Sequence, residues 1–393
     1  MATVLLTGGR APVTLELARV FQRAGHRVLM AESLAWHLSR PSRAVAANFR
    51  VPPPRQDSGG FTRALAEITR RERVDLIVPT CEEIYAVARG RAALEAAGAG
   101  SARPLVLAEP LEKLRGLHDK GLFAQRARAL GLCVPETRRL ESMGDLQATL
   151  AAGGEWVLKP AFSRFAARTR LPPHSAAGLG AARVRPSPSE PWVAQAYARG
   201  RQVCTYSVAH HGQLAAHVAY PVEFSAGQGA AVAFRAIEHP AAQAWVARFV
   251  AAEDFTGQIA FDFIENAGGQ VTALECNPRA TSGAHLLADA PDFARAFFGP
   301  LPQPVSEAGA AARPAMLAAG MLLYALPAAR SWAGLRRWSA AFAGSRDVVA
   351  NRHDPLPGLL QGLSLIPFAA WAVRRHISLI EASTYDIEWN GNA

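Results

Sequence analysis

The stretch from Gln258 to Arg279 reads QIAFDFIENAGGQVTALECNPR and predicts a β-hairpin. Two apolar runs flank a polar segment that ends in Gly268-Gly269, and a glycine pair between such runs is typical of a tight turn. With an even-length loop centred on the glycines, Asp262 lies opposite Glu275. Asn277 follows Glu275 by two residues, so its side chain shares the same face of the sheet.

This hairpin would place two carboxylates and an amide oxygen together in an otherwise apolar segment. Burying two like charges is unfavourable unless a cation compensates them. A partly open set of oxygen ligands suits Mg²⁺ that carries nucleotide phosphates. Arg279, two residues beyond Asn277, would face the same phosphate or an anion beside it. The alternative is a surface hairpin whose carboxylates are merely solvated.

Length and charge set limits on the rest of the molecule. A chain of 393 residues exceeds what one hydrophobic core usually serves, so two or three domains are expected. The net charge of +10 comes mainly from arginine, because lysines are very few. Such a charge suits nucleic acid, an anionic membrane, or phosphate and carboxylate substrates. The sequence shows no aromatic-plus-basic RNA motif and no zinc pattern, so we expect no nucleic-acid partner.

The cysteines, the amino terminus and the lack of long apolar runs indicate where in the cell the protein is expected. The four cysteines form no C-x-x-C pair, which favours a reduced, cytoplasmic protein. The first residues, MATVLLTGGRAP, lack a basic segment followed by an apolar one and are interpreted as a strand and a turn, not a secretion signal. No window reaches about eighteen uninterrupted apolar residues, so we expect no transmembrane segment.

The N-terminal region predicts a doubly wound sheet. Residues 3–7 have the pattern of a buried strand, residues 12–24 of a helix, and residues 26–30 of a second strand. The first turn is G-G-R-A-P and lacks the third glycine of a dinucleotide site, so that interpretation is disfavoured. Glu82 and Glu83 follow a later strand, at the edge where such sheets bind ligands. They could equally stabilise a helix amino terminus.

Three further patterns follow in order. Lys120 lies in a helical pattern that stops at Gly131. Lys159 ends the apolar strand that starts at Trp156, and a lysine at the end of a buried strand needs an anionic partner such as a phosphate. Residues 192–202 then read as a strand that ends in a glycine and a polar residue.

The motif E-x-N-P-R, with an aspartate thirteen residues before the glutamate, resembles the metal-binding hairpin of the ATP-grasp superfamily. The resemblance covers roughly residues 1–290 and is supported by the order of the other patterns. It implies that three hairpin residues bind the metal and that two residues are catalytic, holding phosphate or an acyl phosphate. It implies that the remaining site residues bind the nucleotide. The metal ligands are Asp262, Glu275 and Asn277, the catalytic residues Arg279 and Lys159, and the ATP-binding residues Lys120, Lys159, Ser163, Gln195, Tyr197 and Gln202.

Two positions depart from the family pattern. The loop after Lys159, residues 161–168, contains no glycine, although backbone N–H groups of glycines normally cover the phosphates there. Ser163 could supply a donor instead. Gln202 stands where the family has a carboxylate for the ribose, and an amide oxygen accepts a hydrogen bond without charge assistance.

The resemblance implies an α/β architecture of three parts. Residues 1–109 would form a doubly wound domain that precedes the ATP-grasp part. Residues 110–300 would form the ATP-grasp domain of two α+β subdomains, with a hinge near 195–202. Residues 301–393 would pack on this core as a C-terminal extension. In that extension, residues 316–326 and 359–373 are apolar and are interpreted as core helices. The alternative is an interfacial segment that touches anionic lipid.

The function implied is that of an ATP-dependent ligase. With ATP and Mg²⁺, or Mn²⁺, it would activate a small carboxylate as an acyl phosphate and join it to an amine. The motif is most similar to that of carbamoyl phosphate synthetase-like single-unit proteins, and the chain is far too short for the duplicated synthetase itself. The expected partners are small molecules, and a homodimer is allowed. The second hypothesis is a degenerate ATP-binding module that senses nucleotide or acts as a scaffold.

Overall fold

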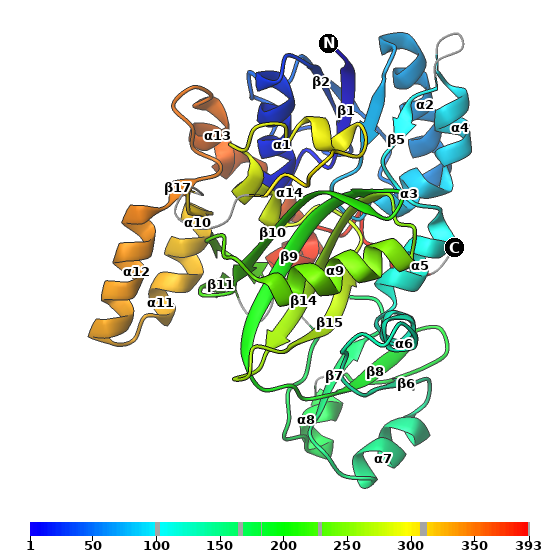
Figure 1. Cartoon of the computed structure of the whole chain (residues 1–393), viewed down its shortest axis with the longest axis vertical. Helices are drawn as coiled ribbons and strands as arrows, with labels where there is room; N and C mark the ends of the chain where they lie inside the picture. Colours follow the sequence, from blue (N-terminus) through cyan, green and yellow to red (C-terminus); the bar gives the residue numbers. More distant parts are fainter. Residues whose placement is uncertain (99–102, 164–167, 182, 227–229, 307–312, 392–393) are drawn as a thin grey trace.

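A computed structural model describes residues 1–98, 103–163, 168–181, 183–226, 230–306 and 313–391. Its N-terminal region is a five-stranded parallel sheet in the order β3-β2-β1-β4-β5, drawn in blue and cyan in Figure 1. The strands are β1 (Thr3–Thr7), β2 (Arg27–Glu32), β3 (Ala47–Arg50), β4 (Leu76–Val78) and β5 (Leu105–Val106). The helices are α1 (Pro12–Arg23), α2 (Ser58–Glu72), α3 (Ile84–Arg89) and α4 (Arg91–Ala96).

Alternating burial on these strands places helices on both faces of the sheet. Leu6 of β1 packs in a cluster with α1. Leu5, its neighbour, packs in the cluster that contains Phe61 and Leu65 of α2. Because successive side chains on a strand point to opposite faces, both faces are covered, as a parallel sheet requires.

A smaller antiparallel sheet in the order β6-β8-β7 forms the lower part of Figure 1. Its strands are β6 (Thr137–Leu140), β7 (Trp156–Pro160) and β8 (Trp192–Ala196), with helices α5 (Leu111–His118), α6 (Lys120–Ala129), α7 (Met143–Ala151) and α8 (Ala176–Ala181). Helix α6 starts where Asp119 accepts hydrogen bonds from the Gly121 and Leu122 N–H groups. It ends near Gly131, which adopts a φ of 66°, as its pattern predicts.

A second antiparallel sheet in the order β10-β9-β14-β15 fills the centre. It consists of β9 (Arg201–His210), β10 (Gln213–Pro221), β14 (Gly257–Glu265) and β15 (Val271–Asn277), with α9 (Pro240–Ala252) on one face. Trp245 and Phe249 of α9 pack on Phe261 and Phe263 of β14, with ring centroids 5.1–5.3 Å apart in three of these pairs. These aromatic contacts fix the strand that carries Asp262.

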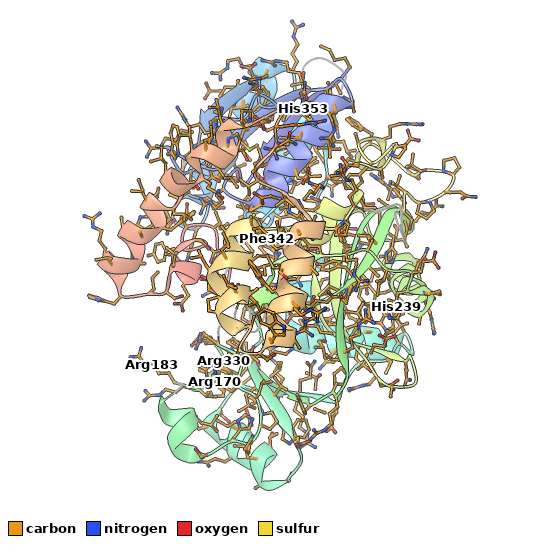
Figure 2. The ribbon with its side chains drawn as sticks, turned by 90° about the vertical axis from the view of Figure 1, so that its left-hand side faces the viewer. Arg170, Arg183, His239, Arg330, Phe342 and His353 are labelled. Atoms are coloured by element: carbon orange, nitrogen blue, oxygen red, sulfur yellow. The ribbon has the colours of Figure 1, made fainter. Side chains whose placement is uncertain are left out.

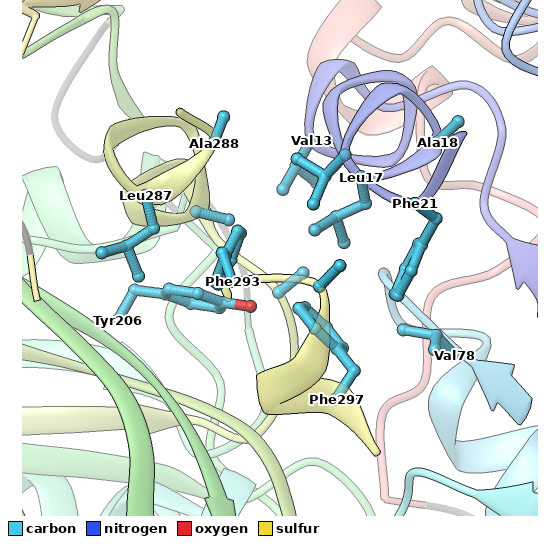
Figure 3. Packing of buried hydrophobic residues seen from close by; sticks show 14 of the residues in the cluster. Val13, Leu17, Ala18, Phe21, Val78, Tyr206, Leu287, Ala288, Phe293 and Phe297 are labelled. Carbon is cyan, nitrogen blue, oxygen red and sulfur yellow. The ribbon is translucent and has the colours of Figure 1, made fainter. Parts of the chain in front are cut away.

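The opposite side of the central sheet is joined to the N-terminal sheet by one hydrophobic cluster, shown in Figure 3. Phe21 of α1 makes an edge contact with Phe297, and Phe297 in turn contacts Phe293. Tyr206 of β9 lies beside Phe293 at 6.5 Å. Two short 3-10 helices supply this packing, η1 (Ser282–Leu287) and η2 (Arg295–Phe297).

The remaining elements are short strands and C-terminal helices. The strands are β11 (Ser225–Ala226), β12 (Ala230–Ala231), β13 (Ala233–Phe234), β16 (Ala315–Met316) and β17 (Arg346–Asp347). The helices are α10 (Ala318–Gly320), the π-helix η4 (Met321–Ala325), α11 (Leu326–Ala328), α12 (Trp332–Gly344), α13 (Leu356–Ser364), α14 (Ile366–Arg375) and α15 (Leu379–Ala382). The predicted α/β class, with a doubly wound N-terminal sheet followed by two α+β parts, is confirmed.

Candidate functional site

The hairpin of β14 and β15 has the predicted pairing at its functional end. Asp262 lies opposite Glu275, and Ala260 lies opposite Asn277. The turn itself differs from the prediction, because Glu265 pairs with Val271 and five residues form the loop. A β-bulge between Asp262 and Phe263 on one strand, and Glu275 and Ala273 on the other, adds one residue and restores the register.

Asp262 and Glu275 form a close pair of carboxyl groups beneath the two lysines. Burial and the neighbouring Glu275 raise the pKa of Asp262 to about 7. Burial also raises the pKa of Glu275, but the charges of Lys120 and Lys159 outweigh it and lower that pKa to about 2. Cys204 of β9 donates its thiol to Asp262 at 2.9 Å. One carboxyl of the pair is therefore charged at neutral pH, and the second is held close to its titration point.

Lys120 and Lys159 approach the same oxygen of Glu275, at 3.6 and 3.8 Å. Lys120 also donates to the carbonyl and the hydroxyl of Ser163, both at 3.2 Å. Desolvation lowers the pKa of Lys159 to about 8, although Glu275 opposes the shift. Of the 42 Lys and Arg residues only three are lysines, and two of those three lie here. Two of the three lysine ammonium groups therefore lie next to the carboxylate pair, close to Glu275.

The carboxylate pair fits a divalent cation. The two carboxyl groups are adjacent, and the charge of Glu275 helps to raise the pKa of Asp262. A bound divalent cation would offset the repulsion between the two carboxylates. Asn277 lies beside the pair with its amide nitrogen 3.5 Å from Asp262 and its oxygen accepting from Arg279, so its role as a metal ligand stays a prediction. Among the described residues no group of three or more His, Cys, Asp or Glu could hold a metal, so a site here has to include the amide or phosphate oxygens.

A pocket of about 250 Å³ lies between the small sheet and the central sheet. Its lining contains six of the predicted site residues, namely Lys159, Gln195, Tyr197, Gln202, Asp262 and Glu275. Val157, Leu171, Ile264 and Leu274 supply apolar walls. The pocket thus has a polar end with Lys159 and the carboxylate pair, where Lys120 approaches Glu275 from outside the lining, and an apolar end, an arrangement that suits a nucleotide.

Gln195 connects the two sheets that form this pocket. Its side-chain amide donates to the hydroxyl of Thr137 and to the carbonyl of Leu274, both at 3.2 Å. Leu274 is the residue at the β-bulge, so the bulge turns its carbonyl toward the small sheet. The Tyr197 N–H donates to the Glu155 carbonyl at 2.8 Å. The role of Gln195 and Tyr197 in binding ATP stays a prediction.

Arg279 lies on the side of the carboxylate pair that faces the N-terminal sheet. It donates to the Asn277 side chain at 2.9 Å, and its Nε lies 4.0 Å from a carboxylate oxygen of Glu82. Glu83 instead accepts from the N–H groups of Thr80 and Cys81. Glu83 therefore holds the turn after β4 without a side-chain hydrogen bond to the α3 amino terminus, and Glu82 lies beside Arg279, where ligand binding stays a prediction.

The C-terminal segment reaches the same place, which the sequence did not indicate. The Trp389 N–H donates to Glu82 at 3.1 Å, and its ring stacks on Tyr85 with centroids 4.5 Å apart. Its edge contacts Phe162 of the loop after Lys159. Asp386 anchors this segment through hydrogen bonds of 2.5 and 2.9 Å from Arg10. The predicted glycine-free loop is only partly visible, because residues 164–167 lie outside the described part of the chain.

By sequence, no family model and no curated protein matches the chain. Solved structures do match its fold. An N5-carboxyaminoimidazole ribonucleotide synthetase in complex with ADP matches with a TM-score of 0.61 and 14% identity over 80% of both chains. The L-amino acid ligase from Bacillus licheniformis matches with a TM-score of 0.58 and 13% identity over 76% of this chain and 72% of the ligase. A biotin carboxylase from Campylobacter jejuni matches with a TM-score of 0.58 and 13% identity over 77% of this chain and 72% of the carboxylase.

These structures are ATP-grasp proteins, and the chain therefore has the ATP-grasp fold. At such identities the likeness concerns the fold alone. The roles of the individual site residues in this chain stay predictions.

Proposed function

We propose that the protein is an ATP- and Mg²⁺-dependent ligase that activates a small carboxylate and joins it to an amine. The observation that carries the proposal is the cluster of Lys120, Lys159, Asp262 and Glu275 at the polar end of the pocket between two sheets. Buried cationic side chains stabilise the negative charge of nucleotide phosphates, and paired carboxylates bind a divalent metal ion. Both are present within hydrogen-bonding or ion-pairing distance of one another.

MgATP, when bound, would supply the phosphoryl group that turns a carboxylate into an acyl phosphate. The chain's own residues would hold the charges that move during this transfer. Lys159 and Lys120 would neutralise phosphate oxygens, while Asp262, Glu275 and Asn277 would hold Mg²⁺, or Mn²⁺ in its place. Arg279, on the far side of the pair, would bind the acyl phosphate. Gln202 would accept from the ribose.

The acceptor side would lie between Arg279 and the N-terminal sheet, where Glu82 and Trp389 are found. This side has a carboxylate that suits an incoming ammonium group and an aromatic ring that limits size. We further propose small-molecule substrates, the absence of a nucleic-acid partner, and a cytoplasmic location. A homodimer stays a prediction.

ADP release tests the proposal. The protein is incubated with MgATP and pools of amino acids and of hydroxy or keto acids. We expect ADP only with a particular acid and amine, and we expect at least a hundredfold lower rate in Glu275→Gln. Glu265→Gln on the same hairpin is the matched control and should keep the rate, because Glu265 faces Arg201 and His239 outside the pocket. Equal rates in the two variants would contradict the proposal.

The second candidate function is an ATP-binding sensor or scaffold without turnover. It is favoured by Gln202, which lines the pocket where a carboxylate is expected, and by the glycine-free loop. Tight MgATP binding in calorimetry, with no ADP from any pool, would select it over the ligase.

A further inference from the structure

Exposed apolar side chains are concentrated in one part of the molecule. Eleven of the sixteen large apolar side chains exposed on the described part of the chain belong to residues 322–379. The region makes up a small share of the sequence, and soluble surfaces seldom group such side chains. The grouping therefore needs a partner.

The longest run of them lies on α13 and α14. Together these helices form a segment from Leu356 to Arg375 with a mean hydropathy of 1.5, of which 17% is buried. Leu359, Ile366 and Val373 are spaced seven residues apart and are 76%, 59% and 75% exposed. Leu363 lies four residues beyond Leu359 and falls on the same side. The helix thus carries a continuous apolar stripe toward solvent, which we call the outer stripe.

The opposite side of the same helix is fixed to the protein. Phe368 is buried with Leu34 and Ala382, and the guanidinium of Arg10 lies 5.9 Å from its ring. By length and composition alone the segment could cross a membrane, so the predicted absence of a spanning segment stays a prediction. Spanning would require Phe368 to leave this contact. The attached helix can instead lie along a surface and present only its outer stripe.

Basic side chains lie at both ends of the stripe. Arg352 and His353 precede α13, and Arg374 and Arg375 end α14, with the Arg375 guanidinium 3.9 Å from the Tyr385 ring. The acidic neighbours are engaged elsewhere. Asp354 is buried against Arg19, and Glu381 accepts from Ser378. An apolar stripe between cationic ends is complementary to a layer with an anionic surface and an apolar interior.

A second apolar segment lies nearby on the chain. Leu323 of η4 is 66% exposed and Trp332 at the start of α12 is 75% exposed, with Arg330 and Arg336 close in sequence. Figure 2 looks onto this side and labels Arg330, while the helix that follows His353 runs along the left-hand edge of the molecule. Both segments lie on the outside of the fold.

We propose that the outer stripe of α13–α14, with Arg352 and Arg374 at its ends, docks on a membrane surface that contains anionic lipid. The apolar side chains would enter the boundary between headgroups and acyl chains, and the arginines would reach lipid phosphates. A second copy of the chain fits the outer stripe less well than a membrane surface does. Two-fold packing of antiparallel helices would bring Arg352 of one copy next to Arg374 of the other, and like charges repel.

Vesicle flotation tests the proposal on the whole protein. The vesicles are phosphatidylcholine alone, or phosphatidylcholine with phosphatidylglycerol at a ratio of about 7:3. We expect at least about tenfold more protein on the anionic vesicles. Leu359→Asp with Val373→Asp should reduce binding at least about tenfold, because charges cannot enter the apolar layer. Arg352→Ala with Arg374→Ala should reduce it about twenty-five-fold at low salt, since each arginine contributes roughly fivefold.

The matched control is Met143→Asp, which places a charge on an exposed apolar residue far from the stripe. It should float like the wild type, and all variants should keep the wild-type circular dichroism and thermal midpoint. Three results would overturn the proposal. They are equal flotation with neutral and anionic vesicles, retention on vesicles after a high-salt and carbonate wash, which indicates spanning, and loss of a dimer in the stripe variant without any vesicle binding.

Discussion

Replacing Asp262 by asparagine should stabilise the metal-free protein above neutral pH, although the change removes a proposed metal ligand. Asp262 and Glu275 lie opposite one another, and the two lysines approach Glu275 rather than Asp262. Asparagine has the same shape as aspartate and can still accept from Cys204. The substitution therefore removes the uncompensated charge and little else.

The size of the effect follows from the pKa of Asp262, which rises from 3.8 to about 7. Between those values the folded protein keeps a proton that the unfolded chain has lost. The free energy of unfolding therefore falls as the pH rises from about 4 to 7, and the full penalty is present above pH 7. A shift of about three units corresponds to about 4 kcal/mol at most, and about 2 kcal/mol remains if solvent screens half of it.

The assay is urea unfolding in EDTA at several pH values between 5 and 8. The gap between Asp262→Asn and the wild type should widen from pH 5 to 8 and reach about 2–4 kcal/mol. In millimolar MgCl₂ the wild type should gain stability and the variant should not, because only the paired carboxylates bind the cation. Glu265→Gln should follow the wild type. A gap that stays constant with pH, or equal stabilisation of both proteins by Mg²⁺, would refute the reasoning.

Three further predictions test other parts of the site and the core. Lys159→Arg keeps the charge but should weaken MgATP binding at least about tenfold in calorimetry, because the larger guanidinium does not fit the buried end of β7; unchanged affinity would contradict this. Gln195→Ala should cost about 1–2 kcal/mol in urea unfolding and speed amide hydrogen exchange around Leu274, because two hydrogen bonds between the sheets are lost. Glu16→Gln should cost about 3 kcal/mol at pH 7, because the pKa of Glu16 lies near 2 despite its burial, owing to its hydrogen bond with His285 and its ion pair with Arg346. That loss should disappear as the pH falls from 4.5 toward 2, since the wild type then loses the same charge.

In the hairpin of β14 and β15, the sequence predicted the strand pairing but not the turn. The pairing of Asp262 with Glu275 was predicted from a turn with an even number of residues, and the pairing is correct while the turn is not. Five residues form the loop, which alone would place the two carboxylates on opposite faces. The bulge at Leu274 corrects the register. The carbonyl at the bulge accepts from Gln195 of the small sheet, a tertiary contact that a local sequence pattern does not contain.

The contacts of the C-terminal segment next to Glu82 could not be predicted from local sequence patterns, because they too are tertiary contacts. The chain order of Lys159, hinge strand and hairpin predicted that these elements meet at one pocket, since each element carries its own signature. Trp389 and Asp386 have no such signature, and their roles depend on Glu82 and Arg10, which lie far away in the sequence. Cys204 likewise has no local signature, because its hydrogen bond to Asp262 depends on the neighbouring strand.

The contact between Arg10 and Asp386 joins positions 376 residues apart, and this has a consequence for synthesis on the ribosome. All strands that form the nucleotide pocket precede residue 278, so that pocket can assemble while translation continues. The wall next to Glu82 is completed only when the segment from Asp386 to Trp389 has emerged. If the protein is the proposed ligase, a nascent or prematurely terminated chain would hold nucleotide before it encloses an acceptor, and a truncation before Asp386 should separate ATP binding from productive turnover.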